Sequence, residues 1–138
     1  RREGAGAAAD AAHMGQCGSP VYMCPALGLG ATPLSKGSDV YSCGVLVWEV
    51  LSGSRPHDGL DAAALPPPPA YLAERAAEWV RARSGTVEAE QLCRFYCAAL
   101  GGLRPATPEQ LAALQPAGVG SWIAAMWHPE PRMRPTLE

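Results

Sequence analysis

Apolar side chains between Asp39 and Ser52 point in every direction around a helix and mark no single face. Ser38 or Asp39 can cap the start of such a helix, and Gly53 can take the left-handed conformation that ends it. Pro56 then prevents continuation. The pattern predicts a helix over about residues 39–52 that is buried on all sides, with the rest of the chain packed around it.

Three later segments have the one-sided apolar pattern of helices that cover a core. Residues 71–83 and 88–100 are the longer two, and the last helix is expected over about residues 121–128. Between them, Thr107 to Gln110 is a capping box with proline at the first helical position, which predicts a short helix to about Leu114. The run Pro66 to Pro69 reads as a polyproline spacer, and an SH3-type ligand is the less common alternative. The chain is therefore expected to be mainly α-helical.

Three residues stand out against this pattern. A carboxylate in a core helix needs hydrogen-bond donors, and glycine in a helix interior costs about 1 kcal/mol relative to alanine, so Asp39 and Gly44 both indicate a specific close neighbour. For Asp39, the simpler alternative is that it caps its own helix. Arg134 lies between prolines and follows two tryptophans, so we expect it to be partly buried with an anionic or carbonyl partner.

Composition excludes several classes of protein. The net charge of −2 gives no basic excess for nucleic acid, and no apolar run is long enough to span a membrane. Five cysteines without a C-x-x-C pair argue against a disulfide framework or a zinc site and favour a reducing compartment such as the cytoplasm. Cys93 and Cys97, one helical turn apart, could form a metal or redox pair, but their place in an apolar stripe favours core packing.

Four segments then resemble protein kinases. Residues 18–26, Gly-Ser-Pro-Val-Tyr-Met-Cys-Pro-Ala, look like the end of an activation segment, whose pattern is G-T/S-P-x-Y-M-A-P-E. Residues 38–49 resemble the buried helix that follows it. Residues 102–105 and 126–136 resemble the G-x-R-P and C-W-x-x-D-P-x-x-R-P-T segments. The resemblance is closest to serine/threonine kinases of the tyrosine-kinase-like branch, and it covers about residues 15–56 and 88–138.

This resemblance implies a division of the chain. Residues 1–26 would be an activation segment and substrate ledge, 38–53 the central buried helix, and 88–138 the C-terminal helices of a kinase C-terminal lobe. Residues 61–87 would be an Ala/Pro-rich insert. The chain begins with Arg1 and reads as a piece truncated on both sides.

The resemblance also implies roles for single residues. Ser19 matches the hydroxyl that positions the catalytic aspartate. The residues that match the ledge for the protein substrate are Pro20, Val21, Tyr22 and Met23. Asp39 matches the carboxylate that holds the catalytic-loop backbone, and Gly44 and Arg134 support the same region. Ala26 replaces the glutamate that usually pairs with the arginine at position 134.

The remaining kinase motifs are absent from the chain. It has no glycine-rich loop, ATP-orienting lysine, H-R-D or D-F-G, and His57-Asp58-Gly59 is interpreted as a loop without chemistry. ATP and Mg²⁺ would therefore be bound by a parent kinase with its N-terminal lobe and catalytic loop, and this chain alone is expected to be inactive. The alternative is a pseudokinase remnant that acts as a binding or scaffold module. An unrelated Ala-rich helical domain would explain none of the four motifs.

Overall fold

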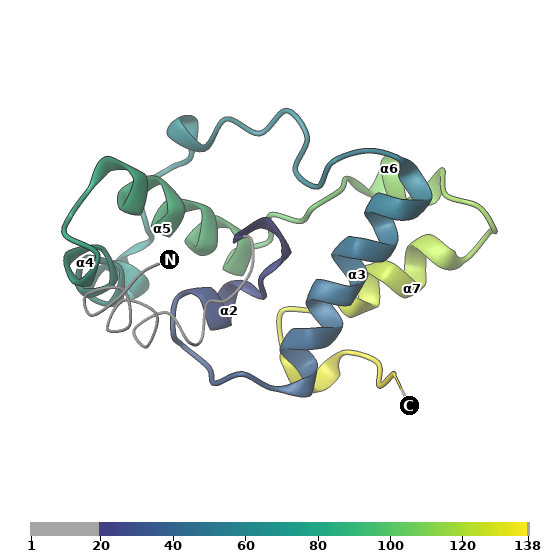
Figure 1. Cartoon of the computed structure of the whole chain (residues 1–138), viewed down its shortest axis with the longest axis horizontal. Coiled ribbons are helices and arrows are strands. Elements are labelled where there is room, and N and C mark those ends of the chain that lie inside the picture. The colour runs from purple at the N-terminus through teal and green to yellow at the C-terminus, as the bar shows by residue number, and fades with distance from the viewer. Residues whose placement is uncertain (1–19, 138) are drawn as a thin grey trace, which may run out of the picture.

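The computed structural model describes residues 20–137, and in this range the protein is mainly helical, with no strand (Figure 1). The helices are α2 (Pro25–Gly28), α3 (Lys36–Ser52), α4 (Ala73–Ala82), α5 (Val87–Leu100), α6 (Pro108–Ala112) and α7 (Val119–Met126). Short 3₁₀ turns are η2 (Pro20–Tyr22), η3 (Ala62–Ala64), η4 (Ala70–Leu72) and η5 (Pro131–Met133). Helices α3 and α7 pack side by side, as do α4 and α5, and α2 lies against α5 (Figure 1). The prediction of a mainly α fold is confirmed.

Helix α3 begins earlier than the sequence pattern predicts. Ser35 and Ser38 form a reciprocal capping box, in which Ser38 N donates to Ser35 Oγ at 3.3 Å and Ser35 N donates to Ser38 Oγ at 2.9 Å. These bonds satisfy donors at the helix start, so neither Ser38 nor Asp39 is the capping residue. The predicted end is confirmed, because Gly53 has φ 70° and follows the last helical residue, Ser52.

The prediction that this helix is buried on all sides is wrong. Val45 and Trp48 are fully buried, whereas Leu46 is 53% exposed, Val50 78% and Leu51 44%. Helix α7, η2 and η5 all pack on α3, and they leave one apolar face of it uncovered among the described residues. An exposed patch of this kind on a helix end is typical of a surface that contacts another chain or segment.

Gly44 has the close neighbour that the sequence indicates. A Cβ at this position would lie 2.9 Å from Trp127 Nε1 and 3.0 Å from Met126 Cβ. The missing side chain therefore allows α7 to approach α3 closely, and Met126 and Trp127 fill the core beside it.

The predicted helix of the insert is confirmed as α4, and it packs firmly on the rest of the protein. Trp79 is buried, and its Nε1 donates to the carbonyl oxygen of Gly28 at 2.9 Å. The Arg83 guanidinium lies 3.7 Å from the Trp79 ring centroid. Before this helix, Pro69 has φ −65° and ψ 160°, as expected for a polyproline spacer. The insert is thus part of the hydrophobic core.

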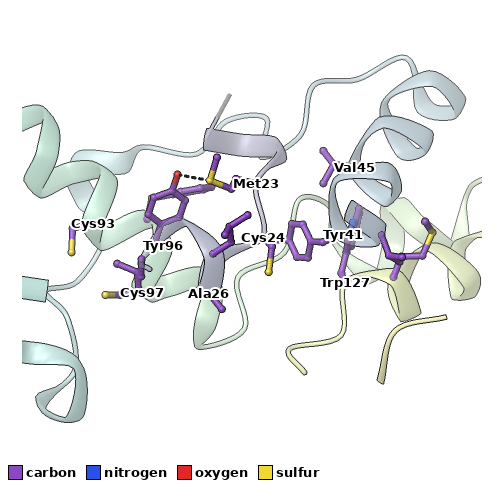
Figure 2. Close-up of a cluster of buried hydrophobic side chains, with 14 of the residues drawn as sticks. Met23, Cys24, Ala26, Tyr41, Val45, Cys93, Tyr96, Cys97 and Trp127 are labelled. Atoms are coloured by element: carbon purple, nitrogen blue, oxygen red, sulfur yellow. Dashed lines mark hydrogen bonds between the residues drawn. The ribbon is translucent and has the colours of Figure 1, made fainter. Parts of the chain in front are cut away.

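Helix α5 carries the two cysteines in the core, as predicted (Figure 2). Cys93 is 1% exposed and Cys97 4%, and both are free thiols. A hydrogen bond between the two side chains raises the pKa of Cys93 and lowers the pKa of Cys97. Core packing therefore accounts for both residues.

The last two helices follow their predicted positions with small shifts. The capping box between Thr107 and Gln110 is confirmed, although α6 ends at Ala112. Helix α7 begins and ends two residues earlier than expected. The apolar pattern of this helix includes Trp122, Ile123 and Met126 and predicts that all three are covered. Ile123 and Met126 are fully buried, but Trp122 is 44% exposed, so the prediction is wrong for Trp122. No helix among residues 20–137 has the length and apolar character needed to cross a membrane.

Gly28→Ala is expected to lower the free energy of unfolding by about 2 kcal/mol, because overpacking a rigid core has this cost. The added Cβ would be 2.5 Å from Tyr96 Cε1 and closer still to Cζ, and that ring is fully buried between α2 and α5. Chemical denaturation measures the change. Gly101→Ala is the matched control, since its Cβ would be 3.5 Å from its nearest neighbour. Equal effects of the two substitutions would contradict the close packing of α2 on α5.

Candidate functional site

The residues predicted to form a substrate ledge, Pro20 to Met23, fold into η2 and the residue after it. Met23 N donates to the carbonyl oxygen of Pro20 at 3.2 Å, which closes the turn. Proline restricts the backbone on the N-terminal side of this turn and again at position 25. Ser19, the predicted partner of a catalytic aspartate, lies outside the described residues.

Helix α3 holds one side of the ledge. Tyr22 Oη donates to Glu49 Oε1 at 2.5 Å, and Ser42 Oγ donates to the carbonyl oxygen of Tyr22 at 2.7 Å. The hydrogen bond to Glu49 raises the pKa of the Tyr22 hydroxyl. Both a side chain and a backbone carbonyl of Tyr22 are thus fixed to α3. No local pattern predicts the contact between Tyr22 and Glu49, because the two residues are far apart along the chain.

Helix α5 holds the other side (Figure 2). Tyr96 Oη lies 3.7 Å from Met23 Sδ, which accepts its hydrogen bond. Burial raises the pKa of Tyr96 to about 12, so its hydroxyl stays protonated as a donor. Met23 and Tyr96 are both buried. The ledge is therefore held between two helices that are distant in sequence.

Arg134 connects the chain segments around the ledge. It is only 6% exposed, and its Nε donates to the carbonyl oxygen of His128 at 2.7 Å. Its Nη1 donates to the carbonyl oxygen of Gly37 at 2.8 Å and lies 3.4 Å from Cys24 Sγ. The guanidinium also lies 5.1 Å from the Tyr41 ring centroid. The prediction of a partly buried arginine with an anionic or carbonyl partner is confirmed, and the partners are carbonyls.

No carboxylate pairs with this arginine among residues 20–137. Glu130 instead lies 3.7 Å from Arg132, and both side chains are exposed. Ala26 is buried in α2 but offers no charge. Carbonyl dipoles thus provide the counterpart of a buried positive charge, where a full negative charge would stabilise it more.

Asp39 does not enter the core. Its side chain is exposed in the first turn of α3, so the expected burial is wrong. It also does not cap its helix, since Ser35 does. Its proposed role in holding a catalytic loop stays a prediction, because residues 20–137 contain no such loop.

Beside the ledge lies His57, which sequence analysis left without a function. Its ring packs edge-on against Phe95 with centroids 4.9 Å apart, and neither ring nitrogen has a hydrogen-bond partner among the described residues. Burial, assisted by the positive charge of Arg104, lowers the pKa of His57 to about 4. A pocket of about 360 Å³ opens between this ring, α5 and the ledge residues Pro20 and Val21.

Known proteins resemble this chain over only part of its sequence. No family model matches the chain, and no solved structure matches it. The chain is similar to mitogen-activated protein kinase kinase kinase 11 from Homo sapiens, Rattus norvegicus and Mus musculus, at 44% identity over 52 residues in each case. The match covers 38% of this chain and 6% of each relative's length. Part of the chain is therefore similar to part of a protein kinase.

Proposed function

We propose that this chain is a section of the C-terminal lobe of a serine/threonine protein kinase, whose parent transfers the γ-phosphoryl group of ATP to a protein hydroxyl. In this proposal residues 20–23 position the protein substrate, and α3 is the helix on which the lobe is built. The partial similarity to a named kinase supports the proposal at the level of the family.

One observation carries most of the argument. Arg134 joins three of the four kinase-like segments, because its guanidinium reaches Cys24 in the first, the Tyr41 ring in the second and the carbonyl of His128 in its own. The fourth segment lies near them as well, since burial raises the pKa of the Tyr41 hydroxyl in α3 to about 12 and the positive charge of Arg104 partly opposes that rise. The four motifs are far apart along the sequence, yet they lie close together in the fold. Segments that resemble kinase motifs by chance would have no reason to come together in this way.

The chain supplies substrate positioning and not phosphoryl transfer itself. Phosphoryl transfer depends on positioning ATP and on stabilising charge with cations. Among residues 20–137, no three histidine, cysteine, aspartate or glutamate side chains come together as metal ligands would. The groups that carry out the reaction would belong to other parts of the parent protein.

The 138-residue chain is therefore expected to bind Mg-ATP no better than a nonspecific protein surface. Isothermal titration calorimetry with Mg-ATP tests this directly, and a complete protein kinase serves as the positive control. Micromolar affinity would contradict the assignment of this chain to a lobe without its nucleotide site.

The parent activity needs a separate experiment. The reading frame around the coding sequence is expressed in full and incubated with radiolabelled ATP and a general protein substrate, and the phosphorylated amino acids are identified. Phosphoserine or phosphothreonine is expected. A frame that lacks the lysine, H-R-D and D-F-G, together with absent transfer, would reject the kinase.

A second candidate function is a pseudokinase-like binding module. Two observations favour it: Ala26 leaves Arg134 without a carboxylate, and Leu46, Val50 and Leu51 form an uncovered apolar face on α3. Such a protein would keep the fold and lose the transfer reaction. The same transfer assay separates the two candidates.

A further inference from the structure

Helices α4 and α5 lie side by side (Figure 1), and a pocket of about 700 Å³ opens between them. Ala73, Ala76 and Ala77 recur at helical spacing and line this α4–α5 pocket from α4, and Val80 follows one turn later. Because alanine carries only a methyl group, this face of α4 leaves room for another molecule. The pocket thus has an apolar wall that the described residues do not fill.

Buried contacts fix the distance between the two helices. Trp79 of α4 and Tyr96 of α5 are both buried and pack edge to face, with ring centroids 5.9 Å apart. Cys93 lines the pocket from α5, and its Sγ donates to the carbonyl oxygen of Ala76 at 3.8 Å. The helices cannot close over the pocket without disturbing these contacts. The pocket is therefore formed before any ligand binds, as is usual for small-molecule sites.

The turn between the helices also lines the pocket. Ser84 and Gly85 have φ values of 68° and 63°, and both belong to the pocket wall. Gly85 N donates to the carbonyl oxygen of Val80 at 2.9 Å, which closes the turn directly after α4. Pro68, in the run before α4, adds a residue with a restricted backbone to the wall. Constrained backbone thus bounds the pocket together with the two helices.

Three charged side chains line the same pocket, Arg81, Glu90 and Arg94. None of them forms an ion pair within residues 20–137. Because the set contains both signs of charge, it selects neither an anion nor a cation. An arginine without an ion-pair partner can stack on the face of an aromatic ring, and a carboxylate can accept a hydrogen bond from an N–H group at the ring's edge. These side chains favour an aromatic ligand over an aliphatic one.

We propose that the α4–α5 pocket binds a small neutral aromatic molecule, with its ring on the alanine face of α4 and a guanidinium stacked over it. A volume of about 700 Å³ lies within the range of about 300–1,000 Å³ that small-molecule sites occupy. Helix α4 belongs to residues 61–87, which the resemblance to kinases does not cover. The site therefore does not depend on the proposed kinase activity.

Indole is the probe, because it is a neutral aromatic molecule with one N–H group, and cyclohexanol is the non-aromatic control. Each is titrated into the ¹⁵N-labelled 138-residue chain and followed by NMR. We expect indole to cause saturable shifts centred on α4 and α5. Cyclohexanol should bind at least about threefold more weakly, the factor expected for one stacked guanidinium at an exposed site.

Ala77→Trp tests the position of the site. Ala77 is exposed and lines the pocket, so a tryptophan there places an indole ring in the pocket and should abolish the response to added indole. Ala82→Trp is the matched control, since Ala82 is exposed on α4 outside the pocket wall, and it should keep the response. Neither substitution alters a buried residue, so both variants should fold.

The double variant Arg81→Met and Arg94→Met tests the stacking. It removes both guanidinium groups and should reduce the preference for indole over cyclohexanol, whereas Arg75→Met, at an exposed arginine outside the pocket wall, should leave it unchanged.

Any of three results would overturn the proposal. The first is an indole response that does not saturate. The second is equal binding of indole and cyclohexanol to the unaltered chain. The third is an equal indole response in Ala77→Trp and Ala82→Trp, which would place the binding elsewhere on the protein.

Discussion

Replacing Arg134 with methionine is expected to lower the free energy of unfolding by about 3 kcal/mol, within the range for the loss of buried charge-assisted hydrogen bonds. The substitution leaves the carbonyl oxygens of His128 and Gly37 without their donor and removes the contact with Cys24. Urea denaturation followed by circular dichroism measures the change. The loss should be smaller than in a kinase relative that has the glutamate at the position of Ala26, because no full ion pair is broken here.

Ala26→Glu tests whether positions 26 and 134 face each other. A glutamate there is expected to stabilise the chain, because Arg134 lacks a carboxylate, and Ala26→Gln is the uncharged control. In a double-mutant cycle, Ala26→Glu and Arg134→Met should show an interaction energy of about 1 kcal/mol or more. An interaction energy of zero would show that the two positions do not face each other, and it would weaken the kinase alignment at both ends.

Acidification is expected to destabilise the protein through His57. The pKa of this imidazole is about 4 in the folded chain and 6.5 in the unfolded chain. Above pH 6.5 both states are neutral at this residue and it makes no difference to stability. As the pH falls from 6.5 to 4, the unfolded state takes up the proton first, so the free energy of unfolding decreases.

The size of this decrease follows from the difference between the two pKa values. It is about 3 kcal/mol as an upper limit and about 2 kcal/mol once partial exposure of the ring to solvent is considered. Denaturation curves across this pH range measure the slope. His57→Asn should remove this contribution to the slope, because asparagine does not titrate there and tolerates the positive φ of 56°.

His128→Gln is the matched control for this experiment. It replaces the other histidine of the described range and should leave the contribution of His57 in place. Its own effect is limited to the hydrogen bond that Glu130 N donates to His128 Nδ1. An unchanged slope in His57→Asn would show that other titrating groups cause the acid sensitivity and that His57 does not contribute to it.

Local sequence signals predicted most of the helices and several of their ends. Gly53, the capping box at Thr107 and the apolar periodicity of residues 88–100 act within a few residues of chain, so they can be recognised without the fold. The start of α3 was missed, because Ser35 and Ser38 form a serine-only version of the capping box. The need of Arg134 for an anionic or carbonyl partner was also predictable, since a buried cation requires one or the other, but only the fold shows that the partners are carbonyls.

The candidate site depended on contacts that no local signal reports. Tyr22 and Glu49, or Met23 and Tyr96, meet only after the chain has folded, and nothing in the residues between them encodes the pairing. The same holds for His57, whose low pKa comes from burial against Phe95 and from Arg104. For Asp39 the prediction was wrong in the other direction. Its place in a core helix suggested a buried side chain, but among the described elements the side chain is exposed.

Local patterns in the sequence are enough to predict that this protein is helical, where its main helices lie and that Arg134 needs an anionic or carbonyl partner. Periodicity, caps and prolines act over one or two turns, so the order of residues alone is enough to reveal them. The fold is needed to show which face of α3 is covered, that Gly44 lets α7 approach closely, and that the insert joins the core through Trp79. Burial and close packing depend on which two surfaces come into contact. They cannot be predicted from either segment alone.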